Sequence, residues 1–181
     1  MAPTLTSPNV DNLQVGKGIV SFQKTGEVTF RDMGNVSSLT ITPDMTTLEH
    51  FTSRLGTKSK DLTVVLEKKG TVKITMEEIT AHNFALMVLG TVDEAAVGGP
   101  EVEIFSQNVV TGALKFVGTN DVGPKITVDL YHISITPDGD IDLISDEWNQ
   151  MELTADMLAA NDGPNAGKFG LAKWTNVEPA S

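Results

Sequence analysis

The fold is decided by one stretch, Asp61-Leu-Thr-Val-Val-Leu-Glu-Lys-Lys-Gly-Thr-Val-Lys-Ile-Thr-Met-Glu-Glu78. It holds two runs of β-branched and apolar residues, which favour extended strands. Between the runs lies Lys69-Gly70, and a glycine in that place is typical of a tight turn. The stretch therefore predicts a β-hairpin, and it favours an all-β fold for the residues around it.

The alternation of apolar and polar residues that marks half-buried strands continues on both sides of this hairpin. It predicts further strands, which cover residues 19–22, 28–30, 36–42, 102–104, 109–117, 125–136 and 169–175. The strand over 36–42 ends at Pro43. Pro137-Asp-Gly-Asp140 supplies a turn, from which Ile141 begins a return strand.

A single segment breaks the alternation and predicts a helix around residues 80–89. Thr80 is suited to the N-cap position, and Gly90 can end the helix. Because the apolar residues between them cover more than one face, we expect the helix to pack against a sheet.

Residues 148–160 fit two structures. Thr154 can cap a helix, with Leu153 and Leu158 as a hydrophobic staple. The same segment alternates apolar and polar residues from Met151 to Met157, as a strand does, and we prefer the strand.

The whole pattern predicts an all-β protein, a β-sandwich or barrel with one flanking helix around 80–89 and a long loop around 43–60. We expect three parts: an extended N-terminal arm over 1–15, a single β domain over 16–176 and a C-terminal tail over 177–181.

The charge of the chain is strongly acidic and unevenly placed. There are 24 acidic and 13 basic residues among 181, for a net charge of −11. Residues 1–80 hold 9 of each, whereas residues 81–181 hold 15 acids and 4 bases. This balance argues against a protein that grips nucleic acid by its phosphates, since phosphate binding needs clustered lysine and arginine.

Several other classes are disfavoured. No window approaches the ~18 consecutive apolar residues of a membrane span, and residues 1–10 lack the order of a secretory signal. The absence of cysteine excludes disulfides, thiolate metal sites and cysteine nucleophiles. We therefore expect a protein made and assembled in the cytoplasm, without membrane contact.

The sequence predicts no catalytic, cofactor or metal site. Asp138, Asp140 and Asp142 match the start of a calcium loop, but Leu143 and Asn149 occupy positions where such a loop needs glycine and glutamate. No Gly-x-Ser-x-Gly motif marks a serine nucleophile. The three histidines are scattered, without the spacing of metal ligands: His50, His82 and His132.

The connection over residues 43–60 is the most informative segment for function. A long structureless connection inside a compact domain is unusual and tends to be functional. It mixes apolar and charged residues, a composition that suits docking on a neighbouring subunit with an apolar centre and a charged rim. The alternative is a lid packed on its own domain.

These features resemble the major tail tube proteins of long-tailed, siphovirus-type bacteriophages. The resemblance rests on an ordered set of segments within residues 28–90: Phe30-Arg-Asp-Met-Gly-Asn-Val36, Leu48-Glu-His-Phe-Thr-Ser-Arg54 and Lys60-Asp-Leu-Thr-Val-Val65. Gly167-Lys-Phe-Gly170 after an acidic strand also looks like that family.

The resemblance implies a structural virion protein. Six copies close into a ring, rings stack into the tail tube, and viral DNA passes through it during ejection without specific binding. Its other partners would be tail proteins, namely the tape measure, tail terminator and distal tail proteins. It would be assembled in the bacterial host cytoplasm.

The resemblance also gives two sets of candidate residues their roles. Residues of the 43–60 connection are expected to contact adjacent subunits or rings: Leu48, Glu49, His50, Phe51, Arg54, Leu55 and Lys58. Acids of the second part are expected to face the lumen and repel DNA: Asp129, Asp140, Asp142 and Glu152.

Two other interpretations stay open. The first is another tube component, either of a secretion system or of the tail terminator type. The second is a β-sandwich module that binds carbohydrate or protein, although the chain has few aromatic residues to stack on sugars.

Overall fold

The structure is a computed structural model that describes residues 12–54 and 56–175. The described chain is built of strands, one α-helix and a short 3₁₀ helix (Gly163–Asn165). The strands and the α-helix are, in chain order, β1 (Gly18–Lys24), β2 (Arg31–Asp32), β3 (Val36–Thr52), β4 (Ser59–Met76), α1 (Ala81–Met87), β5 (Thr91–Asp93), β6 (Glu101–Glu103), β7 (Val110–Gly118), β8 (Lys125–Pro137), β9 (Met151–Met157) and β10 (Gly170–Thr175). This confirms the all-β fold with one helix.

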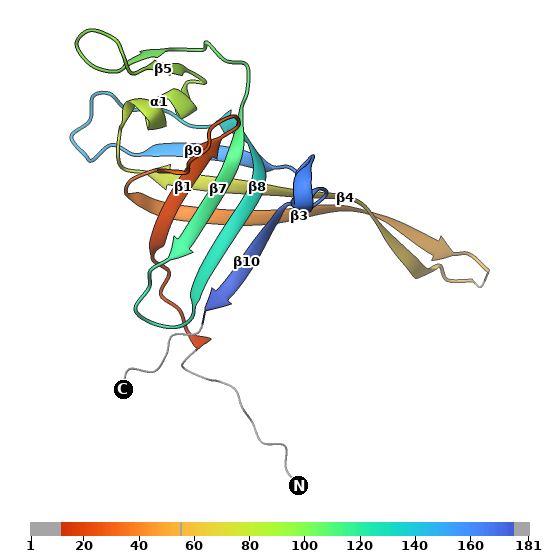
Figure 1. Cartoon of the computed structure of the whole chain (residues 1–181). Coiled ribbons are helices and arrows are strands. Elements are labelled where there is room, and N and C mark those ends of the chain that lie inside the picture. The colour runs from red at the N-terminus through yellow and green to blue at the C-terminus, as the bar shows by residue number, and fades with distance from the viewer. Residues whose placement is uncertain (1–11, 55, 176–181) are drawn as a thin grey trace.

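The main sheet folds over on itself at β8. Its strand order is β2-β1-β7-β8-β9-β4-β3, and β10 pairs with β8 beside this path. The first half of β8 pairs with β10, and the second half, from Ile133, pairs with β9. β1, β7, β8 and β10 thus form one layer, and β9, β4 and β3 run across behind it (Figure 1). Such crossing layers are typical of orthogonal β-sandwiches.

The core lies between the two layers. Alternate residues of each strand point inward, and full burial of one such aliphatic side chain contributes roughly 1.5–3 kcal/mol. The first layer supplies Val20, Phe22, Val110, Leu114, Leu130, Ile133 and Ile135. The second layer supplies Val72, Ile74, Met76, Met151, Leu153 and Ala155. In the described residues the end strands β2 and β3 do not pair with each other, so the sheet does not close into a barrel.

The helix is confirmed, including its cap. The Thr80 hydroxyl accepts a hydrogen bond from the Asn83 backbone N–H at 3.1 Å. The chain leaves the helix through Leu89, which has φ 46°, and not through a left-handed Gly90. Glycine is needed at 90 for another reason: a Cβ there would lie 2.7 Å from the Glu103 carbonyl oxygen of β6.

The predicted hairpin over 61–78 and the predicted loop over 43–60 are both wrong. β4 is one strand that passes straight through Gly70, and β3 passes through Pro43, which pairs with Gly70. Proline is tolerated there because β3 is the last strand of the sheet, where alternate N–H groups have no strand to bond to. At Gly70 a Cβ would lie 2.6 Å from the Met157 sulfur, so the glycine accommodates a packed side chain rather than a turn.

The second half of the chain follows the predictions more closely. The preferred strand over 151–157 is confirmed as β9, and the last strand is confirmed as β10. The return strand predicted to start at Ile141 is wrong, because residues 138–150 form an irregular loop before β9. The N-terminal arm over 1–15 and the C-terminal tail over 177–181 lie mostly or wholly outside the described residues.

Candidate functional site

The most unusual surface is the outer part of the β3–β4 pair, residues 44–52 and 59–69, here named the projecting hairpin. It extends away from both layers of the sandwich (Figure 1). Within it every residue is exposed except Thr52, which is half-buried. A two-stranded ribbon that covers no core is at best marginally stable by itself, which favours contact of its surface with a partner.

Apolar side chains occupy both faces of the projecting hairpin. Leu48 lies opposite Val64, with Leu62 next on the same face. On the other face lie Met45, Phe51 and Val65. Met45, Leu48 and Leu62 expose 60%, 59% and 57% of their surface. An apolar surface of this extent on a folded chain marks an interaction site more often than chance exposure.

The charges on the projecting hairpin are partly paired. Lys60 bonds to Glu49 at 2.7 Å, and His50 Nδ1 lies 2.6 Å from the Asp61 carboxylate. Lys69 bonds to Glu67, and this hydrogen bond together with the lysine's charge lowers the pKa of Glu67 and raises the pKa of Lys69. The first two pairs join β3 to β4, whereas Glu67 and Lys69 both lie in β4.

The predicted contact residues are brought together on this hairpin and on the turn that closes it. Leu48, Glu49, His50 and Phe51 lie in β3, while Arg54 and Lys58 lie in the turn. Leu55 lies outside the described residues. The sequence reasoning missed the other strand of the same surface, whose exposed apolar residues are Leu62, Val64, Val65 and Leu66.

The sequence of residues 62–66 contains a pattern that could have predicted this contact surface. Four apolar residues within 62–66 leave neither face polar, which is typical of a strand covered on both sides. None of the described residues covers them, which makes this strand a candidate contact surface.

The four predicted lumen acids do not share one surface. Glu152 lies on the outer face of the second layer, where registered rows join Ser38, Thr75 and Glu152, then Thr40, Lys73 and Thr154, then Thr42, Thr71 and Asp156. We name these nine residues the threonine face. Asp129 lies on the outer face of the other layer, with Lys115 at 3.8 Å. A channel wall made by one of these faces can hold only one of the two acids.

Asp140 and Asp142 lie in the loop over 138–150, here named the acidic loop. Its first residue joins it to the threonine face, since Asp138 accepts a hydrogen bond from Thr154 at 3.2 Å and lies 4.0 Å from Lys73. Its last residue, Gln150, donates to Glu77 just beyond β4. Between these anchors Ile144 and Trp148 expose 97% and 96% of their surface.

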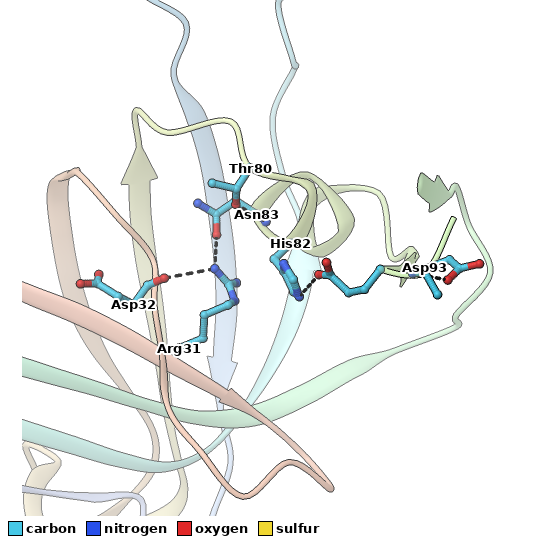
Figure 2. Close-up of polar contacts among 8 residues, drawn as sticks. Arg31, Asp32, Thr80, His82, Asn83 and Asp93 are labelled. Carbon is cyan, nitrogen blue, oxygen red and sulfur yellow. Dashed lines mark hydrogen bonds and ion pairs between the residues drawn. The ribbon is translucent and has the colours of Figure 1, made fainter. Parts of the chain in front are cut away.

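A buried polar joint ties β2 to the helix. Figure 2 shows Arg31 pointing at Asn83, whose side-chain oxygen accepts from the guanidinium at 2.8 Å. The fully buried Asn83 amide donates to the carbonyls of Met33 and Glu78, each at 2.9 Å. Burial lowers the pKa of Arg31, an effect that the nearby Glu27 and Asp32 oppose. Through this network the Phe30–Val36 segment holds the helix against the sheet, because both Arg31 and Met33 bond to Asn83.

A cavity of about 150 Å³ lies beside this joint. Its lining mixes cationic Lys24 and Arg31 with anionic Glu27 and Glu94, and His82 is 3.2 Å from Glu94. It is smaller than the roughly 300–1,000 Å³ of most small-molecule sites. The mixed charges favour no single ligand.

Two further searches concern only the described ranges, 12–54 and 56–175. No cluster of three or more His, Cys, Asp or Glu side chains there is placed to hold a metal ion. No helix there has the length and apolar character needed to cross a membrane.

Comparison with known proteins shows the family. The chain belongs to the family described as "protein of unknown function UCP028589", which it matches over residues 13–99 and 96–173. No curated protein matches.

A solved structure shows the same fold. It is a chain of the structure described as the tail of an empty GTA particle, obtained with helical refinement in C6 symmetry. The match covers 82% of this chain and 96% of that one, with a TM-score of 0.51 and 13% identity.

Proposed function

We propose that this protein is a structural, non-enzymatic subunit of a phage-type tail, and that its copies form stacked hexameric rings of a tail tube. The observation that carries the proposal is the projecting hairpin, an apolar ribbon that a single copy leaves uncovered. The fold it shares with a chain of a C6-symmetric tail supports the six-fold ring. The tube serves as the conduit for DNA ejection.

The projecting hairpin makes the subunit contacts. Leu48 and Phe51 supply apolar contacts, one on each face of the ribbon, and Glu49, His50, Arg54 and Lys58 supply the polar and charged groups around them. A self-assembling subunit must hide this surface to be stable at high local concentration. Burying it between copies removes apolar area from water, at roughly 25 cal/mol per Å².

The threonine face lines the channel. Its short hydroxyl side chains bind no phosphate strongly, and Glu152 and Asp156 outnumber Lys73. Asp140 and Asp142 stand at its margin in the acidic loop. Six copies at −11 each give −66 for a ring. Few lysines and arginines are available to replace the cations that surround DNA, so DNA passes without specific binding. Asp129, on the opposite layer, faces outward.

Cysteine labelling tests this orientation, because the chain has no cysteine of its own. Glu152→Cys should react with a protein-sized maleimide carrier in free subunits and be protected in tubes. Asp129→Cys, on the opposite layer, is the matched control and should react in both. The reverse pattern would assign the channel to the other layer.

The assembled particle defines the remaining partners. A tube of stacked rings starts on a distal tail protein, grows around a tape measure and is closed by a terminator. The subunits are made in the host cytoplasm and end in the virion. A secretion-type tube or a terminator ring uses the same contacts, and it would differ in the number of rings stacked.

Electron microscopy of the purified protein, with light scattering on the same sample, tests the proposal. We expect rings or hollow tubes with six-fold symmetry. A 19.4 kDa monomer that persists when concentrated and when mixed with tail-assembly partners would contradict it and favour a ligand-binding module.

A further inference from the structure

The acidic loop is the second uncovered surface of this chain. Residues 138–150 carry five acids and no base: Asp138, Asp140, Asp142, Asp146 and Glu147. Among the described residues, Asp138 is the only one of these within ion-pair distance of a base. Exposed Leu143, Ile144 and Trp148 stand among the free acids. Tryptophan in such a setting is the residue type that most often dominates binding energy.

The projecting hairpin and its turn carry the complementary charge. Residues 44–69 hold five bases: Arg54, Lys58, Lys60, Lys68 and Lys69. Two of these, Lys60 and Lys69, form ion pairs within the hairpin with Glu49 and Glu67. In the ranges that the structure describes, no carboxylate lies within ion-pair distance of the other three. Residues 44–69 also hold four acids, Asp44, Glu49, Asp61 and Glu67, of which Asp44 has no base within ion-pair distance among the described residues. Each surface therefore combines exposed apolar side chains with unpaired charges, all acidic on the loop and mainly basic on the hairpin.

The turn of the projecting hairpin and the acidic loop lie far apart within one copy. The hairpin turn lies at the start of β4, and the acidic loop lies at its far end, where Gln150 bonds to Glu77. The 18 residues of β4 separate the turn from this far end by up to roughly 60 Å at about 3.3 Å per residue. Figure 1 shows the hairpin and the segment leading into β9 on opposite sides of the molecule. Their contact must join two copies.

We propose that the acidic loop of one copy docks on the projecting hairpin of the next copy. This inference rests on the proposed self-assembly and names the surface that receives the hairpin. A contact between two different patches at opposite ends of a subunit is heterologous, and such contacts close into rings when the rotation between copies allows it. The charge pairing also explains how chains of net charge −11 associate: their few free bases meet the most acidic segment.

Cross-linking tests the contact directly. Thr57→Cys lies in the hairpin turn and Ser145→Cys in the acidic loop, and no native cysteine competes. Tubes assembled from an equal mixture of the two single variants should form mainly the mixed disulfide dimer on oxidation. Thr57→Cys mixed with Lys173→Cys, on the outer face of the first layer, is the control. A dominant product with Lys173→Cys would overturn the proposal.

Charge reversal tests the same contact without cross-linking. Lys58→Glu with Lys68→Glu, or Asp142→Lys with Glu147→Lys, should each raise the concentration needed for assembly by about tenfold or more. Combining both sets should restore assembly. Reversal of two other exposed acids, Glu101→Lys with Asp121→Lys, should leave it nearly unchanged.

These experiments distinguish a failure of the proposed function from a failure of the proposed docking of the acidic loop on the projecting hairpin. If the unmodified protein forms no rings or tubes, the proposed function fails. If it assembles but the reversals act no more strongly than the Glu101 and Asp121 control, or the combined variant is not rescued, then only the docking of the loop on the hairpin fails. Circular dichroism of each variant establishes that it is folded.

Discussion

At the scale of single residues, Asn83 holds the helix on the sheet. Within residues 12–54 and 56–175 it is the one fully buried amide that bonds to three separate segments: β2 through Arg31, the turn after β2 through Met33, and the segment after β4 through Glu78. The sequence predicted the neighbouring cap at Thr80 from its residue type. It did not predict the role of Asn83, because the partners of a buried amide come from segments that only the fold brings near.

Removing this amide should destabilise the fold. Asn83→Ala removes the side-chain partner of the buried Met33 carbonyl, of the part-buried Glu78 carbonyl and of Arg31, which among the described residues keeps only the Asp32 carbonyl. The expected cost is about 3 kcal/mol. Thr80→Ala, which removes only the cap, should cost about 1 kcal/mol. Urea unfolding followed by far-ultraviolet circular dichroism measures both, since the exposed tryptophans report little. Equal costs for the two variants would contradict the role given to Asn83.

The pair Glu67–Lys69 should be visible in a titration. Lys69 lowers the pKa of Glu67, so the small stabilisation from this pair is present above the ordinary glutamate pKa and is lost as the pH falls through the lowered one. Lys69→Ala should move the Glu67 pKa upward toward its ordinary value, as measured by NMR of the side-chain carboxyl. Lys68→Ala is the control, and an equal shift there would refute the pairing.

At the scale of elements, the β3–β4 pair shows where local pattern misleads. Gly70 and Pro43 are ordinary markers of a turn and a strand end, and they predicted a short hairpin and a loop. In the structure they face each other inside one long ladder. The long pairing forms because every residue from 38 to 52 pairs with a residue of β4, with small register shifts. A short window of sequence does not reveal partners that lie so far apart in the chain.

Shortening the hairpin should separate folding from assembly. We expect a variant with Asn-Gly in place of residues 44–69 to keep its free energy of unfolding within about 1 kcal/mol, because the segment buries no side chain in the core. It should form no rings or tubes. Thermal unfolding and electron microscopy measure the two effects, and a shortened protein that still assembles would contradict the role of the hairpin.

At the scale of the whole molecule, composition and alternation were sufficient for the fold class but not for the layers. The alternating runs at 125–136 and 151–157 identified β8 and β9 correctly. They could not show that β8 divides its pairing between β9 and β10. The same limit applies to the predicted lumen acids. Asp129 and Glu152 each lie at a polar position of an alternating strand, and the sequence does not show that the two strands belong to opposite layers.

The charge distribution predicts how the free protein treats DNA. The subunit should not retard a DNA duplex at about 50 mM salt, because its bases are few and scattered. Glu152→Lys with Asp156→Lys places three lysines, with Lys73, on the threonine face. That variant should retard DNA at about 50 mM salt and release it near 200 mM. Retardation by the unmodified protein in an electrophoretic mobility assay would contradict the proposed channel.

The unbroken course of β4 has a mechanical consequence. The strand that carries the proposed contact surface is the same strand that crosses the core. A pull on the hairpin along its axis therefore slides β4 lengthwise past β9, and all six registered pairs from Thr71 to Met76 bear the load together. When two strands are pulled lengthwise past each other, their hydrogen bonds share the force. When one strand is peeled away from its end, the hydrogen bonds break one after another. A filament of such subunits can thus carry tension from one copy to the next without first unfolding any of them.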